Sequence, residues 1–168
     1  AGVGDDGNGT GVAFADFDRD GDQDLFIAKG GFTLRGERNR LFRNDGDGTF
    51  TDVSAAWGLD AERSSYAAAV GDFDRDGYLD LFVTQLRGQE STLYRNRAGR
   101  FEDVTQSKGI QSFFQFSNAA AALSDFDNDG DVDLYAGLFG DFDRFYADVG
   151  DTAYAVQAVG DRGDMVGL

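Results

Sequence analysis

The sequence contains no Cys and no His, and its only Lys residues are Lys29 and Lys108. Without Cys the fold cannot be braced by disulfides, and cysteine usage gives no indication of the redox compartment. Without His the chain lacks the commonest general base and the usual protein ligand of zinc, copper and haem iron. We therefore expect a noncatalytic protein, with no catalytic residues and no transition-metal centre.

Long hydrophobic runs and a net positive charge are also missing. No stretch approaches the roughly 18–20 apolar residues that a membrane span needs, and residues 1–5 lack the features of a signal peptide. We interpret the chain as a mature or excised segment without a membrane span. Its formal charge of -16 and pI near 4.1 would repel nucleic acid and anionic membranes. We expect no nucleic-acid partner, and cations are the natural ligands.

The residues that are present predict a folded, Asp-rich repeat protein. With 41% hydrophobic and 14% aromatic residues, the chain should form a single repeat domain over residues 1–168. Asp accounts for 27 of the 31 acidic residues, a bias that turns and metal loops explain better than solubility does. Residues 16–24, 72–80 and 125–133 are closely similar and begin 56 and then 53 residues apart. This spacing indicates three copies of one unit.

Each copy is expected to contain four short strands. A run of small residues precedes each Asp-rich loop and would by itself suggest a helix. We interpret these runs as strands because each is only four or five residues long and enters a Gly/Asp turn. Three apolar segments of strand length follow in each copy. The pattern predicts an all-β protein with three propeller-type blades of four antiparallel strands, at about 11–53, 66–104 and 117–158.

The Asp-rich loops predict three metal sites. In each nine-residue loop, carboxylates occupy positions 1, 3, 5 and 9, and Gly at position 6 permits a sharp bend. Alternate side chains of such a turn can point at one centre. Position 7 is Asp, Tyr and Asp in the three copies, so we expect it to bind through its carbonyl. The predicted ligands are Asp16, Asp18, Asp20, Asp22 and Asp24; Asp72, Asp74, Asp76, Tyr78 and Asp80; and Asp125, Asp127, Asp129, Asp131 and Asp133.

The ligand set favours calcium. Hard oxygen ligands without His or Cys select calcium or magnesium, and a flexible set of carboxylates plus a carbonyl prefers calcium. We expect about three Ca²⁺ ions, one per repeat. An EF-hand would need a bidentate Glu at position 12, where Ile27, Val83 and Ala136 stand, and helices on both sides. Turns without metal are the plainer alternative, but they explain one such loop more easily than three in identical register.

These loops resemble those of FG-GAP and VCBS repeats. The resemblance extends to the Leu-Phe/Tyr-Arg-Asn segments that end at Asn44 and Asn96, and to the Gly-x-Phe-x-Asp-Val segments at 48–53 and 99–104. Such repeats build integrin α-subunit propellers and many secreted bacterial proteins. The resemblance covers nearly the whole chain and implies calcium between the first two strands of each blade, in an extracellular or cell-surface protein. The third copy departs from the pattern after Leu134.

Three blades raise a problem of closure, because closed propellers usually have four to eight. Exposed sheet edges and apolar faces would then need a cover. We expect either part of a larger propeller or a head-to-tail assembly, a filament or a ring, with neighbouring blades or self-association as the partner. Phe17, Phe73 and Phe126 share loop position 2, which predicts a repeated packing role between blades.

The predicted function is a noncatalytic, calcium-binding structural or adhesive module. The alternative is a carbohydrate-binding or carbohydrate-active propeller of lyase or hydrolase type, with a protein or glycan ligand. It would need a convergent polar site outside the repeats, for which Asp141 and Asp143 are weak candidates. Asn8-Gly9-Thr10 matches the N-glycosylation pattern, and Arg162-Gly163-Asp164 matches the tripeptide of integrin ligands, although both motifs also arise by chance.

Overall fold

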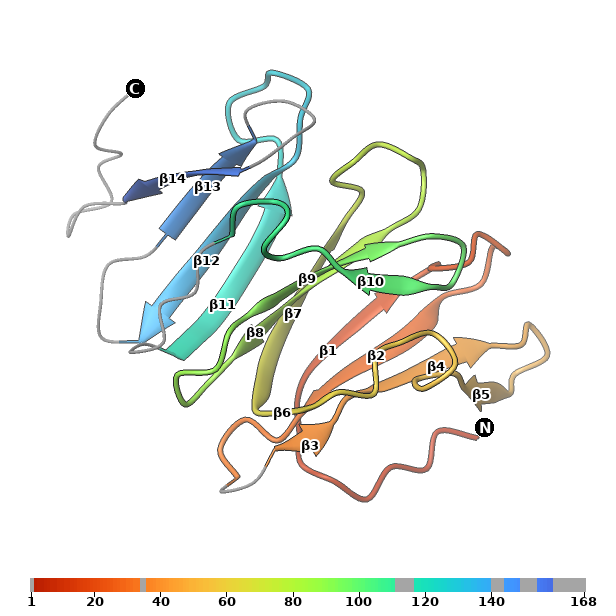
Figure 1. The fold of residues 1–168 in the computed structure, drawn as a ribbon. Coiled ribbons are helices and arrows are strands. Elements are labelled where there is room, and N and C mark those ends of the chain that lie inside the picture. The colour runs from red at the N-terminus through yellow and green to blue at the C-terminus, as the bar shows by residue number, and fades with distance from the viewer. Residues whose placement is uncertain (1, 34–35, 111–116, 140–143, 149–153, 159–168) are drawn as a thin grey trace.

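The computed structural model describes residues 2–33, 36–110, 117–139, 144–148 and 154–158, and every regular element among them is a β-strand. Most strands belong to three four-stranded antiparallel sheets that stand side by side (Figure 1). The prediction of an all-β chain with three propeller-type blades is therefore confirmed.

Each blade is a meander in which successive long strands pair. Blade 1 consists of β1 (Gly9–Ala15), β2 (Asp24–Lys29), β4 (Arg40–Asn44) and β5 (Phe50–Asp52). Blade 2 consists of β7 (Ser65–Gly71), β8 (Asp80–Gln85), β9 (Thr92–Asn96) and β10 (Phe101–Asp103). Blade 3 consists of β11 (Ser117–Ser124), β12 (Asp133–Phe139), β13 (Arg144–Asp148) and β14 (Tyr154–Ala158). The runs of small residues are thus strands, despite their helix propensity.

A fourth, two-stranded sheet has no counterpart in the repeat pattern. It pairs β3 (Glu37–Arg38) with β6 (Glu62–Arg63), and Gly30 forms an additional parallel bridge to Ser65. These contacts tie the middle of blade 1 to the connection that leads into blade 2. Two-residue polar strands carry no hydrophobic alternation, so the sequence gives no local signal for them.

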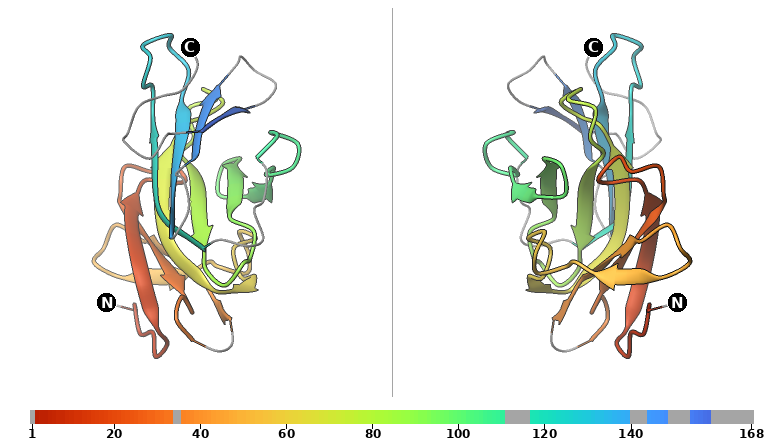
Figure 2. Two further views of the ribbon diagram at one scale, coloured as in Figure 1. Left: turned by 90° about the vertical axis from the view of Figure 1, so that its left-hand side faces the viewer. Right: turned by 90° about the vertical axis from the view of Figure 1, so that its right-hand side faces the viewer.

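The hydrophobic core lies between blades rather than inside any one of them. The first core cluster combines Phe17 and Phe26 of blade 1 with Leu81 and Val83 of blade 2. The second cluster joins blade 2 to blade 3 in the same way, around Phe73. Figures 1 and 2 show the first strands of the blades, β1, β7 and β11, running next to one another. Each blade therefore buries its apolar face against the next.

The first strands approach one another closely, which explains their small residues. A β-carbon on Gly11 would lie 2.6 Å from the carbonyl oxygen of Tyr66 in the neighbouring blade. A β-carbon on Gly71 would lie 3.0 Å from the Cβ atom of Leu123. Larger side chains at these positions would force the blades apart.

Candidate metal sites

The three Asp-rich segments form the same loop, each joining the first strand of a blade to the second. In the first loop, the Asp16 carboxylate accepts hydrogen bonds from the backbone N–H groups of Asp20 at 3.1 Å and Gly21 at 3.0 Å. The same two bonds, 2.9–3.2 Å long, recur in the other loops. The position-6 glycines have φ of 96°, 91° and 95°, the left-handed region that glycine adopts without strain. The sequence thus folds each loop around its first carboxylate.

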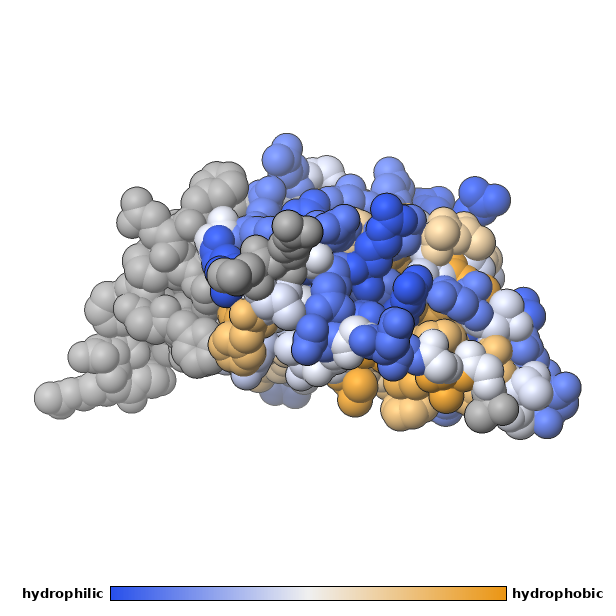
Figure 3. Space-filling view, turned by 90° about the horizontal axis from the view of Figure 1, so that it is seen from below, coloured by the Kyte–Doolittle hydropathy of each residue, from blue (hydrophilic) through white to orange (hydrophobic). Residues whose placement is uncertain are grey.

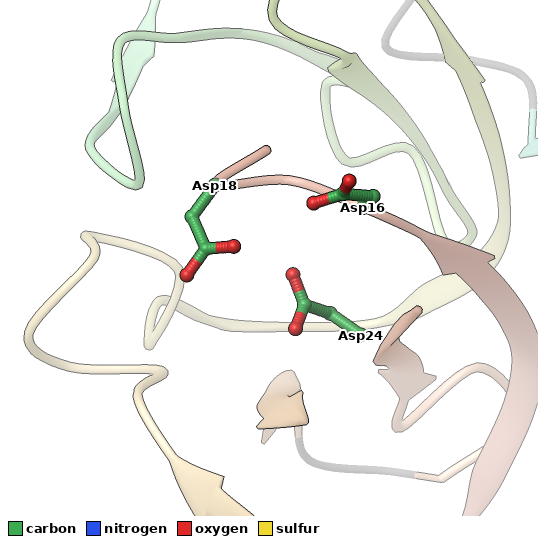
Figure 4. Close-up of side chains that lie close together, drawn as sticks. All are labelled: Asp16, Asp18 and Asp24. Atoms are coloured by element: carbon green, nitrogen blue, oxygen red, sulfur yellow. The ribbon is translucent and has the colours of Figure 1, made fainter. Parts of the chain in front are cut away.

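Positions 1, 3 and 9 of each loop converge. Asp16, Asp18 and Asp24 each offer a carboxylate oxygen, and these oxygens lie within 4.8 Å of one another. Figure 4 shows the three carboxylates gathered around one space. The corresponding residues of the other loops are clustered within the same limit: Asp72, Asp74 and Asp80, and Asp125, Asp127 and Asp133.

The spacing of these oxygens fits a calcium ion. Calcium binds oxygen at about 2.3–2.6 Å, so two oxygens on one ion are at most about 5 Å apart. The three carboxylates of each cluster meet this limit without rearrangement. They would supply part of the six to eight oxygens that calcium takes, and other loop atoms or water would supply the rest.

The position-9 carboxylate is buried and links the loop to the sheet. Asp24, fully buried, accepts hydrogen bonds from the backbone N–H of Phe17 at 3.0 Å and of Asn44 at 2.9 Å. Asp80 accepts the equivalent bonds from Phe73 at 2.9 Å and Asn96 at 2.7 Å. This residue therefore connects the loop to the third strand of its blade, in addition to facing the other two carboxylates.

Burial makes the position-9 carboxylates unusually weak acids. It raises the pKa of Asp24 from its ordinary value of 3.8 to about 6, against the opposing effect of two backbone hydrogen bonds. For the same reason the pKa of Asp80 rises to about 7. Burial, followed by the charge of Asp20, also raises the pKa of Asp18. A bound cation would relieve both the lost solvation and the repulsion between carboxylates.

Positions 5 and 7 lie outside the three-carboxylate clusters. The position-5 carboxylates of Asp20, Asp76 and Asp129 each accept a 2.9 Å hydrogen bond from the position-7 N–H of their own loop. The position-7 side chains of two loops face a neighbouring loop instead: Tyr78 lies under Arg19, and Asp131 pairs with Arg75. Ligation by all five positions of each loop remains a prediction, and the clustering of carboxylate oxygens favours positions 1, 3 and 9.

The loop arginines are functional candidates that the sequence analysis did not single out. Arg19 and Arg75 both occupy position 4, with left-handed φ of 65° and 56°. The guanidinium of Arg19 lies 5.3 Å from the ring centre of Tyr78. Their shared position in two repeats was the available signal, and it indicates contact between successive loops.

A polar group away from the Asp-rich loops was also missed. The buried Lys29 forms ion pairs with Asp5 and Glu37. Glu37 in turn accepts hydrogen bonds from the backbone N–H of Asn8 at 3.0 Å and from its side-chain amide at 2.7 Å. Lys29, Glu37 and Asn8 border an open hollow of about 430 Å³, which Arg40 also lines. Their positions have no repeat relationship, so sequence periodicity could not group them.

Some candidates lie outside the residues that the structure describes. They are the pair Asp141 and Asp143 and the tripeptide 162–164. Across the described ranges, no helix has the length and apolar character required to cross a membrane.

The three equivalent loops on antiparallel blades place the chain in the class of β-repeat proteins with acidic loops. The family model for the FG-GAP-like repeat matches residues 32–83 and 72–136, which together cover more than half of the chain. The chain belongs to the FG-GAP-like repeat family, and the resemblance inferred from the loop motifs is confirmed.

Three curated relatives share part of this sequence. Cartilage acidic protein 1 of Xenopus tropicalis is 35% identical over 102 residues, which cover 58% of this chain and 15% of the relative. The Homo sapiens and Mus musculus proteins of the same name are 33% and 31% identical, with the same coverage. The chain thus spans about 15% of the length of the curated relatives it matches.

Proposed function

We propose that the protein is a noncatalytic, extracellular calcium-binding repeat module with a structural or adhesive role. The observation that carries the proposal is the threefold recurrence of one carboxylate cluster at the same bend of each blade. A turn that served only to reverse the chain would not need to bury a carboxylate beside two others, because burying charge without a partner is costly. Family membership is consistent with this role.

Each ion would be held by the carboxylates at positions 1, 3 and 9, joined by the position-5 carboxylate and the position-7 carbonyl. Calcium supplies positive charge, and the protein supplies a loop already shaped by its own hydrogen bonds. Because the folded loop binds the ion and the unfolded chain does not, binding stabilises the fold by about 2.7 kcal/mol per site when free calcium is 100 times the dissociation constant. The role is therefore structural.

Two observations support the proposed extracellular location. FG-GAP and VCBS repeats are typical of integrin α-subunits and secreted proteins, as the motifs implied. The curated relatives are named as acidic proteins of cartilage, and this chain carries a formal charge of -16. Free calcium at millimolar concentration outside cells could load even weak sites, since extracellular calcium modules have dissociation constants of about 10⁻⁴–10⁻³ M.

Calorimetric titration of the calcium-free chain tests the proposal. We expect three ions per chain and a higher midpoint of thermal unfolding when calcium is added. Asp18→Asn, Asp74→Asn and Asp127→Asn should each remove one ion, because each neutralises one position-3 ligand. Asp6→Asn, an exposed residue outside the loops, is the matched control and should retain all three. No heat and no thermal shift on adding calcium to the wild-type chain would overturn the proposal.

Carbohydrate binding is kept as a second candidate because of the polar hollow beside Lys29. This hollow combines acidic, basic and amide groups away from the Asp-rich loops, which is a convergent arrangement of the kind that such a function needs. A glycan array with and without calcium distinguishes the candidates. Saccharide binding that is lost in Arg40→Ala but kept in Arg97→Ala would favour this alternative.

A further inference from the structure

The three Asp-rich loops share one carboxylate cluster but differ in charge. Position 7 is Asp in the loops of blades 1 and 3 and Tyr78 in the loop of blade 2. Position 4 is Arg19 in blade 1, Arg75 in blade 2 and Asn128 in blade 3. The loop of blade 2 therefore combines the smallest number of carboxylates, four, with an Arg. Calcium loops adjust their dissociation constant by the charge of their ligands, so the three loops should not bind the ion equally.

A second arginine stands beside the carboxylate cluster of blade 2. Arg95, on β9, places its Nη1 atom 4.0 Å from the carboxylate of Asp74, the position-3 member of the cluster. Its side chain is only 24% exposed, and its Nε atom is buried without a hydrogen-bond partner. Its Nη2 atom bonds to Glu102 at 2.9 Å, but that side chain is 63% exposed, so water and salt screen its charge. A positive charge thus lies next to the cluster that would receive the ion.

The equivalent arginine of blade 1 is neutralised by a neighbour. Arg43 donates from Nε at 3.2 Å and from Nη2 at 2.7 Å to one oxygen of Asp45. In blade 2 the residue at the position of Asp45 is Arg97. Arg95 therefore has a second cation next to it in the sequence, where Arg43 has a carboxylate.

Blade 3 has no charged residue at this strand position. The backbone of β13 pairs with β12 in the register in which β9 pairs with β8. Ala147 therefore stands at the strand position that Arg95 holds in blade 2. Of the three blades, blade 2 has the arginine that is least neutralised by its surroundings.

The contacts between successive loops add to the same difference. Arg19 of the first loop extends over the ring of Tyr78, with its guanidinium carbon 5.3 Å from the ring centre. It lies so close to position 6 that a β-carbon on Gly77 would be 2.8 Å from its Nη1 atom. Arg75 reaches the third loop, where it meets the carboxylate of Asp131 at 2.6 Å. The second loop therefore receives a cation against a neutral phenol, whereas the third loop receives one against a carboxylate.

We propose that the loop of blade 2 is the weakest of the three calcium sites and the one whose occupancy responds to changes in calcium concentration. The inference rests on the calcium binding proposed above and ranks the sites by charge. Each nearby cation repels a divalent ion, and the carboxylate missing at position 7 removes part of the attraction. Arg95 and Arg19 thus set the affinity without ligating the ion. We expect a dissociation constant roughly tenfold above those of the other two loops.

Chains that keep one loop each test the ranking by calorimetric titration. Replacing the position-3 Asp by Asn disables two loops at a time. Asp18→Asn/Asp127→Asn keeps the loop of blade 2, Asp74→Asn/Asp127→Asn keeps that of blade 1, and Asp18→Asn/Asp74→Asn keeps that of blade 3. We expect calcium to bind all three chains, and to bind the first of them about tenfold more weakly than the others. An affinity in the first chain that equals or exceeds that of either other chain would overturn the inference.

Two substitutions separate the surroundings of a loop from the loop itself. In the chain that keeps the loop of blade 2, Arg95→Gln should lower the calcium dissociation constant roughly three- to fivefold, the effect of one partly exposed charge. In the chain that keeps the loop of blade 1, Arg43→Gln should change it less, because Asp45 already neutralises that arginine. An unchanged affinity in Arg95→Gln, or an equal gain in both variants, would contradict the role given to Arg95.

Arg87→Gln is the matched control for the loss of one positive charge. Arg87 is exposed and follows β8, at the opposite end of blade 2 from the Asp-rich loop. Figure 1 shows the three loops at the upper ends of their blades, and Figure 3 views the molecule from the opposite end, where hydrophilic side chains gather. The control should leave the calcium affinity of the loop unchanged. A gain equal to that of Arg95→Gln would show that net charge alone sets the affinity and would overturn the inference.

Circular dichroism shows whether each chain keeps the strand spectrum. If a double variant does not fold, titration of the single variants gives the same ranking. Asp74→Asn should remove the weakest of the three binding steps, whereas Asp18→Asn and Asp127→Asn should each remove a tighter one. Removal of a tighter step by Asp74→Asn would overturn this inference and leave calcium binding itself in place. A wild-type chain that binds no calcium would overturn both proposals.

Discussion

The guanidinium of Arg75 in the second Asp-rich loop lies 2.6 Å from the carboxylate of Asp131 in the third. The same guanidinium donates a hydrogen bond to the carbonyl of Gly130 at 3.3 Å. Arg19 reaches from the first loop to the second in the corresponding way, over the ring of Tyr78. A left-handed conformation at a residue other than Gly costs roughly 1–2 kcal/mol, and these contacts offset it. Successive Asp-rich loops are therefore in direct contact.

We predict a measurable coupling between Arg75 and Asp131. Both side chains are partly solvated, so the pair should contribute only about 0.5–1 kcal/mol to the free energy of unfolding. Urea unfolding of Arg75→Ala, Asp131→Ala and the double variant gives this value as the departure from additivity. Arg97→Ala, in which an exposed Arg outside the loops is removed, should have a smaller effect. Strict additivity would show that the contact is energetically neutral.

A second prediction compares the same loop position in two blades. Phe17 is fully buried and makes an edge-to-face contact with Phe101, with ring centres 5.5 Å apart. Phe17→Ala should destabilise the chain by about 3–5 kcal/mol, as expected when a large aromatic residue is removed from a core. Phe126→Ala, measured in dilute solution, should cost less than about 1 kcal/mol because its side chain is half exposed. Equal losses of stability in the two variants would contradict the finding that the hydrophobic core lies between blades.

A third prediction concerns the side-chain amide of Asn96, which connects blade 2 to blade 1. Asn96 is fully buried and donates to carbonyl groups of two blades. Asn96→Ala leaves those carbonyls unsatisfied, so it should reduce the free energy of unfolding by about 1–3 kcal/mol. Asn44→Ala at the equivalent, more exposed position is the matched control and should have a smaller effect. Denaturant titration of both variants under the same conditions decides the comparison.

A fourth prediction is a decrease in the stability of the calcium-free chain as pH rises. The pKa values of about 6 for Asp24 and about 7 for Asp80 exceed the ordinary 3.8, so the folded state holds protons that the unfolded state has released. The stability that these protons provide is complete below about pH 4 and is lost as pH rises through 6 and 7. Thermal unfolding in chelator at pH 5 and pH 8 measures the effect.

Calcium should reverse this trend, because the ion replaces the protons. Binding should release protons between pH 5 and 7, and calcium affinity should increase over the same range. The variant Asp24→Asn/Asp80→Asn, which lacks the two titrating groups, should show a weaker pH dependence in chelator. A calcium-free wild-type chain that becomes more stable between pH 5 and pH 8 would contradict the prediction.

Local sequence patterns were sufficient to predict the blades. Short apolar runs between turn residues indicated the strands. The three Asp-rich segments indicated that these strands form three repeated units. Even the alanine-rich run of β11 was identified, because its length and its Gly/Asp flank outweighed helix propensity. The contribution of each loop carboxylate was harder to predict. Equal spacing makes Asp18 and Asp20 look alike, yet only Asp18 joins Asp16 and Asp24 in the cluster.

Contacts between distant, nonrepeating residues could not be predicted. The pairing of β3 with β6 joins two short polar segments, and the ion pairs of Lys29 bring together residues from three separate parts of the chain. Such contacts follow from how the blades stack, and they leave no periodic trace in the sequence. The exposure of Phe126 could not be predicted either. Its loop motif is the same as that around Phe17, and only the position of its blade differs.

A core located between blades has a consequence for how the chain unfolds. Since a blade gains most of its stability from its neighbours, the free energy should be a sum of nearest-neighbour terms, as in other linear arrays. Among the described residues, blade 2 shares one core cluster with blade 1 and a second with blade 3. The strands of blade 2 should therefore exchange their amide hydrogens more slowly than those of blades 1 and 3.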